Sequence, residues 1–201
     1  MDIETYRSRT GAYARHENAY LRLSGYSSVD RILLSTVVYR PPEDVFPYLE
    51  SFRDYPRYAE HLESVTRDGD GGPGTRYDLR LSWWKLSYTA RSEVTEIDPP
   101  HSLEWRLVKD VDARGEWRVQ PESESAPEGE ETASRIYFEA VYDPHSTNTD
   151  AVSLPRFVSL GWVITKVRPR LLEEAERVVR RLVADVEGES RPVELTVHET
   201  P

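Results

Sequence analysis

The sequence predicts an α+β fold in which a set of antiparallel strands packs against one long C-terminal helix. Apolar and polar residues alternate over most of residues 62–142, which is typical of strands with one buried face. From about residue 154 to 186 the apolar spacing changes to three and four residues, which is typical of an amphipathic helix. The chain has 201 residues, of which 38% are hydrophobic, so we expect one domain with one core.

Before the alternating region, the sequence predicts one strand and two short helical segments. Residues 32–39 are rich in β-branched and apolar side chains, which predicts the first strand. A short helix is expected after Pro42, because a proline followed by Glu43 and Asp44 suits the positive end of a helix dipole. A second brief helical turn is expected at residues 55–58.

Within the alternating region, one face of each strand is apolar and the other is charged. Breaks at residues 68–74, 98–101 and 112–115 divide this region into successive antiparallel strands. Because side chains alternate between the two faces of a strand, the aromatic residues of neighbouring strands come to share one face. That face needs an apolar partner, and the C-terminal helix offers one in Val163, Val167 and Leu171.

The two ends of the chain are expected to lie outside the domain, which we place at residues 28–187. Residues 1–27 form an N-terminal arm that packs on the domain, meets another subunit or stays a mobile terminus. Residues 188–201 form a tail that is either an edge strand near residues 193–197 or a frayed end. Within the long helix, Pro169 is expected to cause a kink or a break.

Composition excludes several classes of function. The formal net charge of −10 argues against binding to nucleic acid or to an anionic membrane surface. No apolar run is long enough for stable membrane insertion and no secretory signal is evident, so a cytoplasmic location is expected. The absence of cysteine excludes disulfides and thiolate chemistry. Lysine occurs only at Lys85, Lys109 and Lys166 among 26 basic residues, an arginine bias that resembles proteins of salt-loving archaea and that a GC-rich genome also produces.

Motifs of catalysis or of metal binding do not stand out in the sequence. The five histidines lack the spacing of a metal site, and there is no nucleophile elbow or phosphate-binding loop. We therefore expect no metal and no cofactor, and we favour a binding protein over an enzyme.

Three local motifs add a family resemblance. They are residues 41–46, residues 54–58, and Asp98-Pro99-Pro100 followed by Leu103-Glu104-Trp105. In their order along the chain they resemble the SRPBCC superfamily, also called START-related or helix-grip proteins, and within it the polyketide cyclase/dehydrase and coenzyme Q-binding groups. The resemblance covers residues 29–186. It implies a curved antiparallel sheet wrapped around a long C-terminal helix, two short helices after the first strand, and an apolar cavity between sheet and helix.

The resemblance implies that this cavity binds or transports a hydrophobic small molecule, such as a lipid, a quinone, an isoprenoid or a polyketide-like ring. Pockets of this kind are lined mostly by apolar and aromatic side chains. The same side chains could instead simply fill a core. The candidate ligand-binding residues are Tyr77, Leu79, Leu81, Trp83, Tyr88, Trp105, Trp117, Val163, Val167 and Leu171.

Two alternative functions remain open at this stage. A polyketide aromatase/cyclase would use Arg91 and Tyr88, because relatives of this type are thought to hold an enolising substrate with an arginine and a tyrosine. A protein-interaction module would have a filled core, and its N-terminal arm would bind a partner or a second copy, giving a homodimer.

Overall fold

The computed structural model describes residues 29–83, 86–143, 146 and 160–200, and it describes their side chains except at residues 83, 86 and 160–171. The predicted N-terminal arm lies outside the described residues. The side chains of four candidate site residues, namely Trp83, Val163, Val167 and Leu171, also lie outside them.

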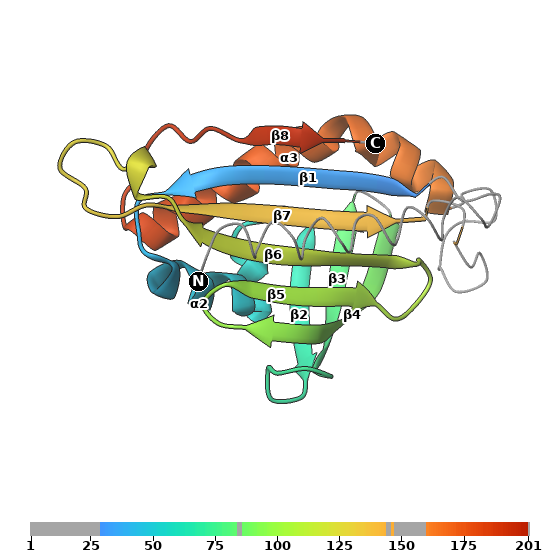
Figure 1. Ribbon diagram of the computed structural model, residues 1–201. Helices are drawn as coiled ribbons and strands as arrows, with labels where there is room; N and C mark the ends of the chain where they lie inside the picture. The colour runs from blue at the N-terminus through green and yellow to red at the C-terminus, as the bar shows by residue number, and fades with distance from the viewer. Residues whose placement is uncertain (1–28, 84–85, 144–145, 147–159, 201) are drawn as a thin grey trace, which may run out of the picture.

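The described strands form one antiparallel sheet with the order β2-β3-β4-β5-β6-β7-β1-β8. In Figure 1, β2, β3 and β4 turn across the direction of the longer strands, so the sheet is strongly curved. This sheet, together with the C-terminal helix, confirms the predicted α+β fold. The strands are β1 (Asp30–Val38), β2 (Leu62–Asp68), β3 (Arg76–Trp83), β4 (Leu86–Asp98), β5 (Ser102–Leu107), β6 (Ala113–Pro121), β7 (Ser134–Tyr142) and β8 (Thr196–Glu199).

The two α-helices among the described residues lie before and after the run of strands from β2 to β7. Between β1 and β2 lie α2 (Pro42–Glu50) and the 3-10 helix η1 (Phe52–Arg57), and a single 3-10 turn, η2 (Ser123–Ser125), precedes β7. The C-terminal helix α3 (Leu160–Glu187) continues through Pro169, so of the kink or break predicted there, the break does not occur. None of the helices in the described part of the chain is both long enough and apolar enough to cross a lipid bilayer.

The strand register separates two chemically different faces of the sheet. Trp117 lies opposite Phe138 on β7 and opposite Leu103 on β5, so all three side chains share the face that we call the inner face. The inner face packs against α2 and the C-terminal half of α3 in a core built by Val38, Val45, Phe46, Leu49, Val119, Ile136, Leu182, Val183 and Val186, among others. The opposite, outer face carries ion pairs between strands, such as Arg31 with Glu139 at 3.0 Å.

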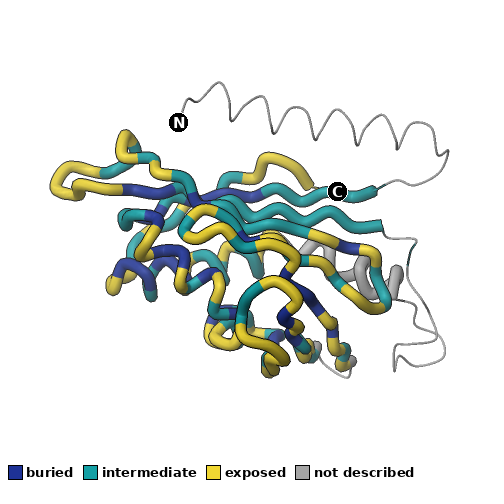
Figure 2. Tube along the Cα trace, turned by 60° about the horizontal axis from the view of Figure 1, so that its bottom comes forward, coloured by how far each residue is buried: buried dark blue, intermediate teal, exposed yellow. Residues whose placement is uncertain are grey.

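The core occupies only one end of the inner face. Figure 2 shows buried segments around α2 and the neighbouring end of β1, whereas the far ends of the long strands are only partly buried. At that far end the inner-face residues Ile32, Leu107 and Ala140 are half-buried, and Leu81 is 37% exposed. The far end also holds the start of α3 and the β5–β6 turn (Figure 1).

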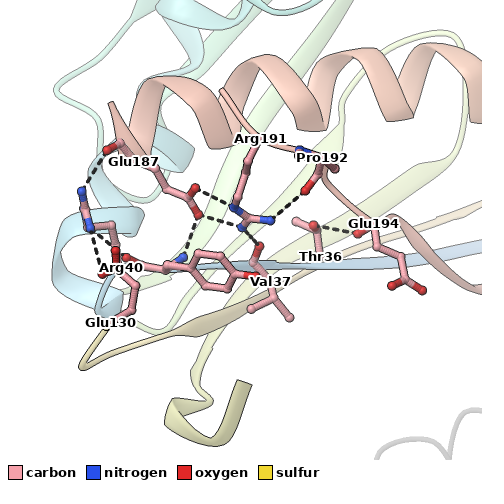
Figure 3. Close-up of polar contacts among 9 residues, drawn as sticks. Thr36, Val37, Arg40, Glu130, Glu187, Arg191, Pro192 and Glu194 are labelled. Atoms are coloured by element: carbon pink, nitrogen blue, oxygen red, sulfur yellow. Dashed lines mark hydrogen bonds and ion pairs between the residues drawn. The ribbon is translucent and has the colours of Figure 1, made fainter. Parts of the chain in front are cut away.

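A buried ionic cluster fixes the C-terminal end of α3 to β1 (Figure 3). The Glu187 carboxylate accepts hydrogen bonds from the Tyr39 main-chain N–H at 2.8 Å and from Arg191 Nε at 2.7 Å and Nη2 at 2.8 Å. Arg191 also donates to the Val37 carbonyl and stacks on the Tyr39 ring, with the guanidinium carbon 3.8 Å from the ring centre. We call Glu187, Arg191 and Tyr39 the helix clamp. The helix ends next to it at Gly188, whose φ of +80° suits glycine.

Of the two alternatives for the tail, the structure contains the edge strand. It is β8, which pairs with β1 slightly later in the chain than the sequence predicts. His198 Nε2 lies 2.8 Å from Ser35 Oγ, and Arg31 Nη1 lies 3.1 Å from Glu199 Oε2. The tail therefore completes the sheet beside β1.

Candidate functional site

The candidate residues on β3 do not share one environment. Tyr77 is 3% exposed, and its ring centre lies 4.7 Å from that of Phe52 in the core. Leu79 is half-buried against the same core, and Leu81 is exposed. Along β3 the inner face thus changes from filled core at Tyr77 to accessible apolar surface at Leu81.

Trp105 and Trp117 form a half-buried aromatic group with Phe138 in the middle of the inner face. The ring centre of Phe138 lies 4.6 Å from that of Trp117 and 6.3 Å from that of Trp105. Gly115 makes this packing possible, because a Cβ built there would lie 2.3 Å from both the Trp105 ring and the Glu139 carbonyl. The group separates the filled end of the inner face from the partly buried end, where Ala140 lies.

Arg91 does not lie with Tyr88, contrary to the pairing expected for a cyclase. Arg91 is opposite Asp78 on the outer face and forms a bidentate ion pair with it, with N–O distances of 2.6 and 2.7 Å. The ion pair lowers the pKa of Asp78 and raises that of Arg91. Tyr88 is opposite Leu81 on the inner face. Residues three apart on a strand point to opposite faces, so these two side chains cannot hold one substrate together.

Tyr88 instead lies near Asp110, in the turn between β5 and β6. Burial and the neighbouring Asp110 raise the pKa of Tyr88 to about 12, so its phenol keeps its proton at neutral pH. Tyr88 Oη and Asp110 Oδ2 are both buried, and the Asp110 carboxylate acts on the Tyr88 phenol, although neither atom has a partner at full hydrogen-bond geometry among the described residues. The Asp110 side chain is only 2% exposed, and its nearest cation is Lys109, with Nζ 3.5 Å from Oδ2. Its backbone is left-handed, with φ of +68°.

An open hollow of about 430 Å³ adjoins this pair. It is lined by Arg106, Leu107, Val108, Lys109, Asp110, Val111, Asp112 and Ser146. Asp110 therefore lies between the hollow and the inner-face residue Tyr88. Hydrogen bonds join the turn to its neighbours, from the Val108 N–H to the Arg91 carbonyl at 2.9 Å and from the Asp112 N–H to Ser146 Oγ at 2.8 Å.

On the outer face, the carboxyl group of Glu116 has a raised pKa. Desolvation raises the pKa of Glu116 from 4.5 to about 7, against the opposing effect of Arg118. Arg118 Nε lies 3.3 Å from a Glu116 oxygen and its Nη2 lies 3.7 Å from Glu139. Among the described residues, no group of three or more histidine or acidic side chains is placed to hold a metal ion.

The geometry of the sheet and helix agrees with a family comparison. Residues 31–187 match the model of the family described as polyketide cyclase / dehydrase and lipid transport. The chain belongs to this family. The match spans the region from β1 to the end of α3 and excludes β8. Among curated proteins, none matches this sequence significantly.

Several solved structures share the fold of this family member at low sequence identity. A Thermus thermophilus protein has a TM-score of 0.57 at 18% identity, covering 79% of this chain and 97% of the other. The Zhui aromatase/cyclase from a Streptomyces species has a TM-score of 0.60 at 14% identity, and the alignment covers 79% of this chain and 94% of Zhui. The two-domain aromatase/cyclase StfQ of steffimycin biosynthesis has a TM-score of 0.57 at 13% identity, covering 80% of this chain and 51% of StfQ.

Sequence reasoning missed Asp110 as a candidate. The residue lies in a turn, where no periodic pattern reports which side chains are buried. The available signal was small: an aspartate is one of the few non-glycine residues that tolerate a left-handed backbone, and Asp110 lies three residues after β5 ends at Leu107.

Proposed function

We propose that this protein binds or carries a hydrophobic small molecule at the far end of the inner face, between the sheet and α3. The ligand classes are those expected from the sequence, namely a lipid, a quinone, an isoprenoid or a polyketide-like ring. The observation that carries the proposal is that the core fills one end of the inner face and leaves the other end apolar but only partly buried.

Several features of the far end support a ligand site there. Leu81 is an exposed apolar residue, and Trp105 and Phe138 offer half-buried rings on which a flat or chain-like molecule can stack. The small side chain of Ala140 leaves space on the inner face at this end of the sheet. Pockets for small molecules are mostly apolar with a few polar groups, and this end of the face has that composition.

The test is thermal unfolding of the full chain at high salt with a panel of quinones, isoprenoids, fatty acids and aromatic polyketides. A ligand at one hundred times its dissociation constant adds about 2.7 kcal/mol to the free energy of unfolding, which raises Tm by roughly 5–10 °C in a domain of this size. Tryptophan fluorescence provides an independent readout, since Trp105 lies at the proposed site. A Tm unchanged across the whole panel would contradict the proposal.

A matched pair of variants locates the binding site. Ala140→Leu fills the floor of the inner face, whereas Val141→Leu adds bulk at the next residue, which faces outward. We expect the first variant to weaken ligand binding and the second to preserve it. Equal effects of the two variants would place the ligand elsewhere.

A second candidate function is that of an aromatase/cyclase. It is favoured by the two related aromatase/cyclase structures and by the Tyr88–Asp110 pair, which offers a phenol and a carboxylate to a bound polyketide. Such an enzyme would accelerate cyclisation chiefly by holding a folded substrate. Turnover of a ligand found in the panel, and its loss in Tyr88→Phe, would favour this function over simple binding.

A further inference from the structure

We infer that Tyr88 and Asp110 form a polar anchor for a hydroxyl group on an otherwise apolar ligand. This inference rests on the proposed function, because it names the chemical class of the ligand bound at the far end of the inner face. It also fixes the orientation of that ligand, with the hydroxyl toward the β5–β6 turn and the apolar body toward Trp105.

Two buried polar groups from different elements, Tyr88 on β4 and Asp110 in the β5–β6 turn, face each other beside the inner face. The Asp110 carboxylate acts on the Tyr88 phenol, and Lys109 Nζ lies 3.5 Å from Asp110 Oδ2, yet neither Tyr88 Oη nor Asp110 Oδ2 has a partner at full hydrogen-bond geometry in the described chain. A buried polar group without a well-formed hydrogen bond destabilises the folded protein. Two such groups side by side, one of them on a left-handed aspartate, are better explained by a binding role than by stability.

The chemistry of the pair selects a neutral hydroxyl. Asp110 offers an acceptor, and the phenol of Tyr88 offers a donor because it stays protonated at neutral pH. A hydroxyl group can donate to the first and accept from the second at the same time. A carboxylate ligand would be repelled by Asp110. An ammonium ligand would bring a second cation next to Lys109, which is already 3.5 Å from the Asp110 carboxylate.

The location of the pair suits this role. Asp110 lines the 430 Å³ hollow on one side, and Tyr88 projects on the inner face opposite Leu81 on the other. A ligand lying along the inner face would therefore reach the pair with one end, and its apolar part would remain among Leu81 and the aromatic group. A hydroxyl that enters the pair gives each of the two atoms a well-formed hydrogen bond, so the site should discriminate strongly against a ligand that lacks it.

The experiment compares two compounds of nearly the same shape, β-naphthol and β-methylnaphthalene, in displacing the fluorescent reporter anilinonaphthalene sulfonate from the full chain. We expect the wild type to bind the naphthol about 10- to 100-fold more tightly than the methyl compound. Tyr88→Phe and Asp110→Asn should bring this ratio close to one while leaving the affinity for the methyl compound unchanged. Asparagine tolerates the left-handed backbone at position 110, so the variant preserves the turn.

Two control variants separate the anchor from general effects of mutation. Asp98→Asn removes an exposed carboxylate at the end of β4, outside the hollow, and Tyr137→Phe removes a phenol from the outer face, so both should retain the wild-type ratio. A wild-type ratio near one would overturn the inference and leave the proposed function standing, and so would equal losses for both compounds in Tyr88→Phe and Asp110→Asn. Displacement by neither compound would count against the proposed function as well.

Discussion

Replacing Glu187 by alanine is expected to destabilise the protein strongly, because this side chain holds three hydrogen bonds in the helix clamp. Only 4% of the Glu187 side chain and 19% of the Arg191 side chain are exposed. Truncation leaves the guanidinium of Arg191 and the N–H of Tyr39 without this acceptor. Removing one partner of a buried ion pair costs about 3–5 kcal/mol. For a domain of this size we therefore expect Tm to fall by about 6–20 °C.

The assay is thermal and urea unfolding of Glu187→Ala beside a matched control, Glu63→Ala. Glu63 also pairs with an arginine, but its side chain is 47% exposed and that of Arg80 is 59% exposed. Because exposed ion pairs contribute little, the control should keep nearly the wild-type Tm. Limited proteolysis provides a second readout, since loss of the clamp should expose the chain after residue 188. Equal stability of the two variants would refute the role of the clamp.

Three further predictions concern the two faces of the sheet. Gly115→Ala should lower stability by about 1–3 kcal/mol in urea unfolding, because the new Cβ would clash with the Trp105 ring and a carbonyl that cannot move freely; an unchanged midpoint would contradict the packing described. Arg91→Gln should leave ligand affinity unchanged in the panel assay, because Arg91 pairs with Asp78 on the outer face. Weakened binding would show that Arg91 contributes to the ligand site. Glu116→Gln should become increasingly more stable than the wild type as the pH rises from about 4.5 to 7, and the gap should then level off. In this window the folded protein keeps a proton on Glu116 that the unfolded chain has lost, so wild-type stability falls as pH rises, by up to about 1.4 kcal/mol per pH unit. Charges around this carboxyl come from Arg118, Glu104, Glu139 and Glu96, and a gap that stays constant between pH 5 and 8 would show that its pKa is not raised.

The sheet was predictable from the sequence because strand periodicity reports the side that each residue faces. Trp105 and Trp117 were placed on one face from their alternation with charged residues, and the register confirms this. The same rule also argues against pairing Arg91 with Tyr88, since an odd separation along a strand reverses the face. That pairing came from a resemblance to cyclases and not from the strand pattern.

Features that depend on contacts between distant segments were not predictable. Asp110 lies in a turn and its surroundings come from β4, so neither periodicity nor composition indicates its burial. The helix clamp joins residues 148 positions apart, and the sequence shows Glu187 only as one more acidic residue near a helix end. The contrast between the filled and the partly buried end of the inner face depends on where α2 packs. No local sequence pattern predicts that position.

The pairing of β1 has a consequence for how the chain folds during synthesis. This strand leaves the ribosome well before its partners: Arg31 pairs with Glu139 at a separation of 108 residues, and Ser35 pairs with His198 at a separation of 163. Contacts so distant in sequence form slowly, and an apolar strand without neighbours is prone to associate with other chains. Until β7 is made, both edges of Asp30–Val38 are open, and until β8 is made one still is. We therefore expect nascent chains truncated before β7 to depend on chaperones.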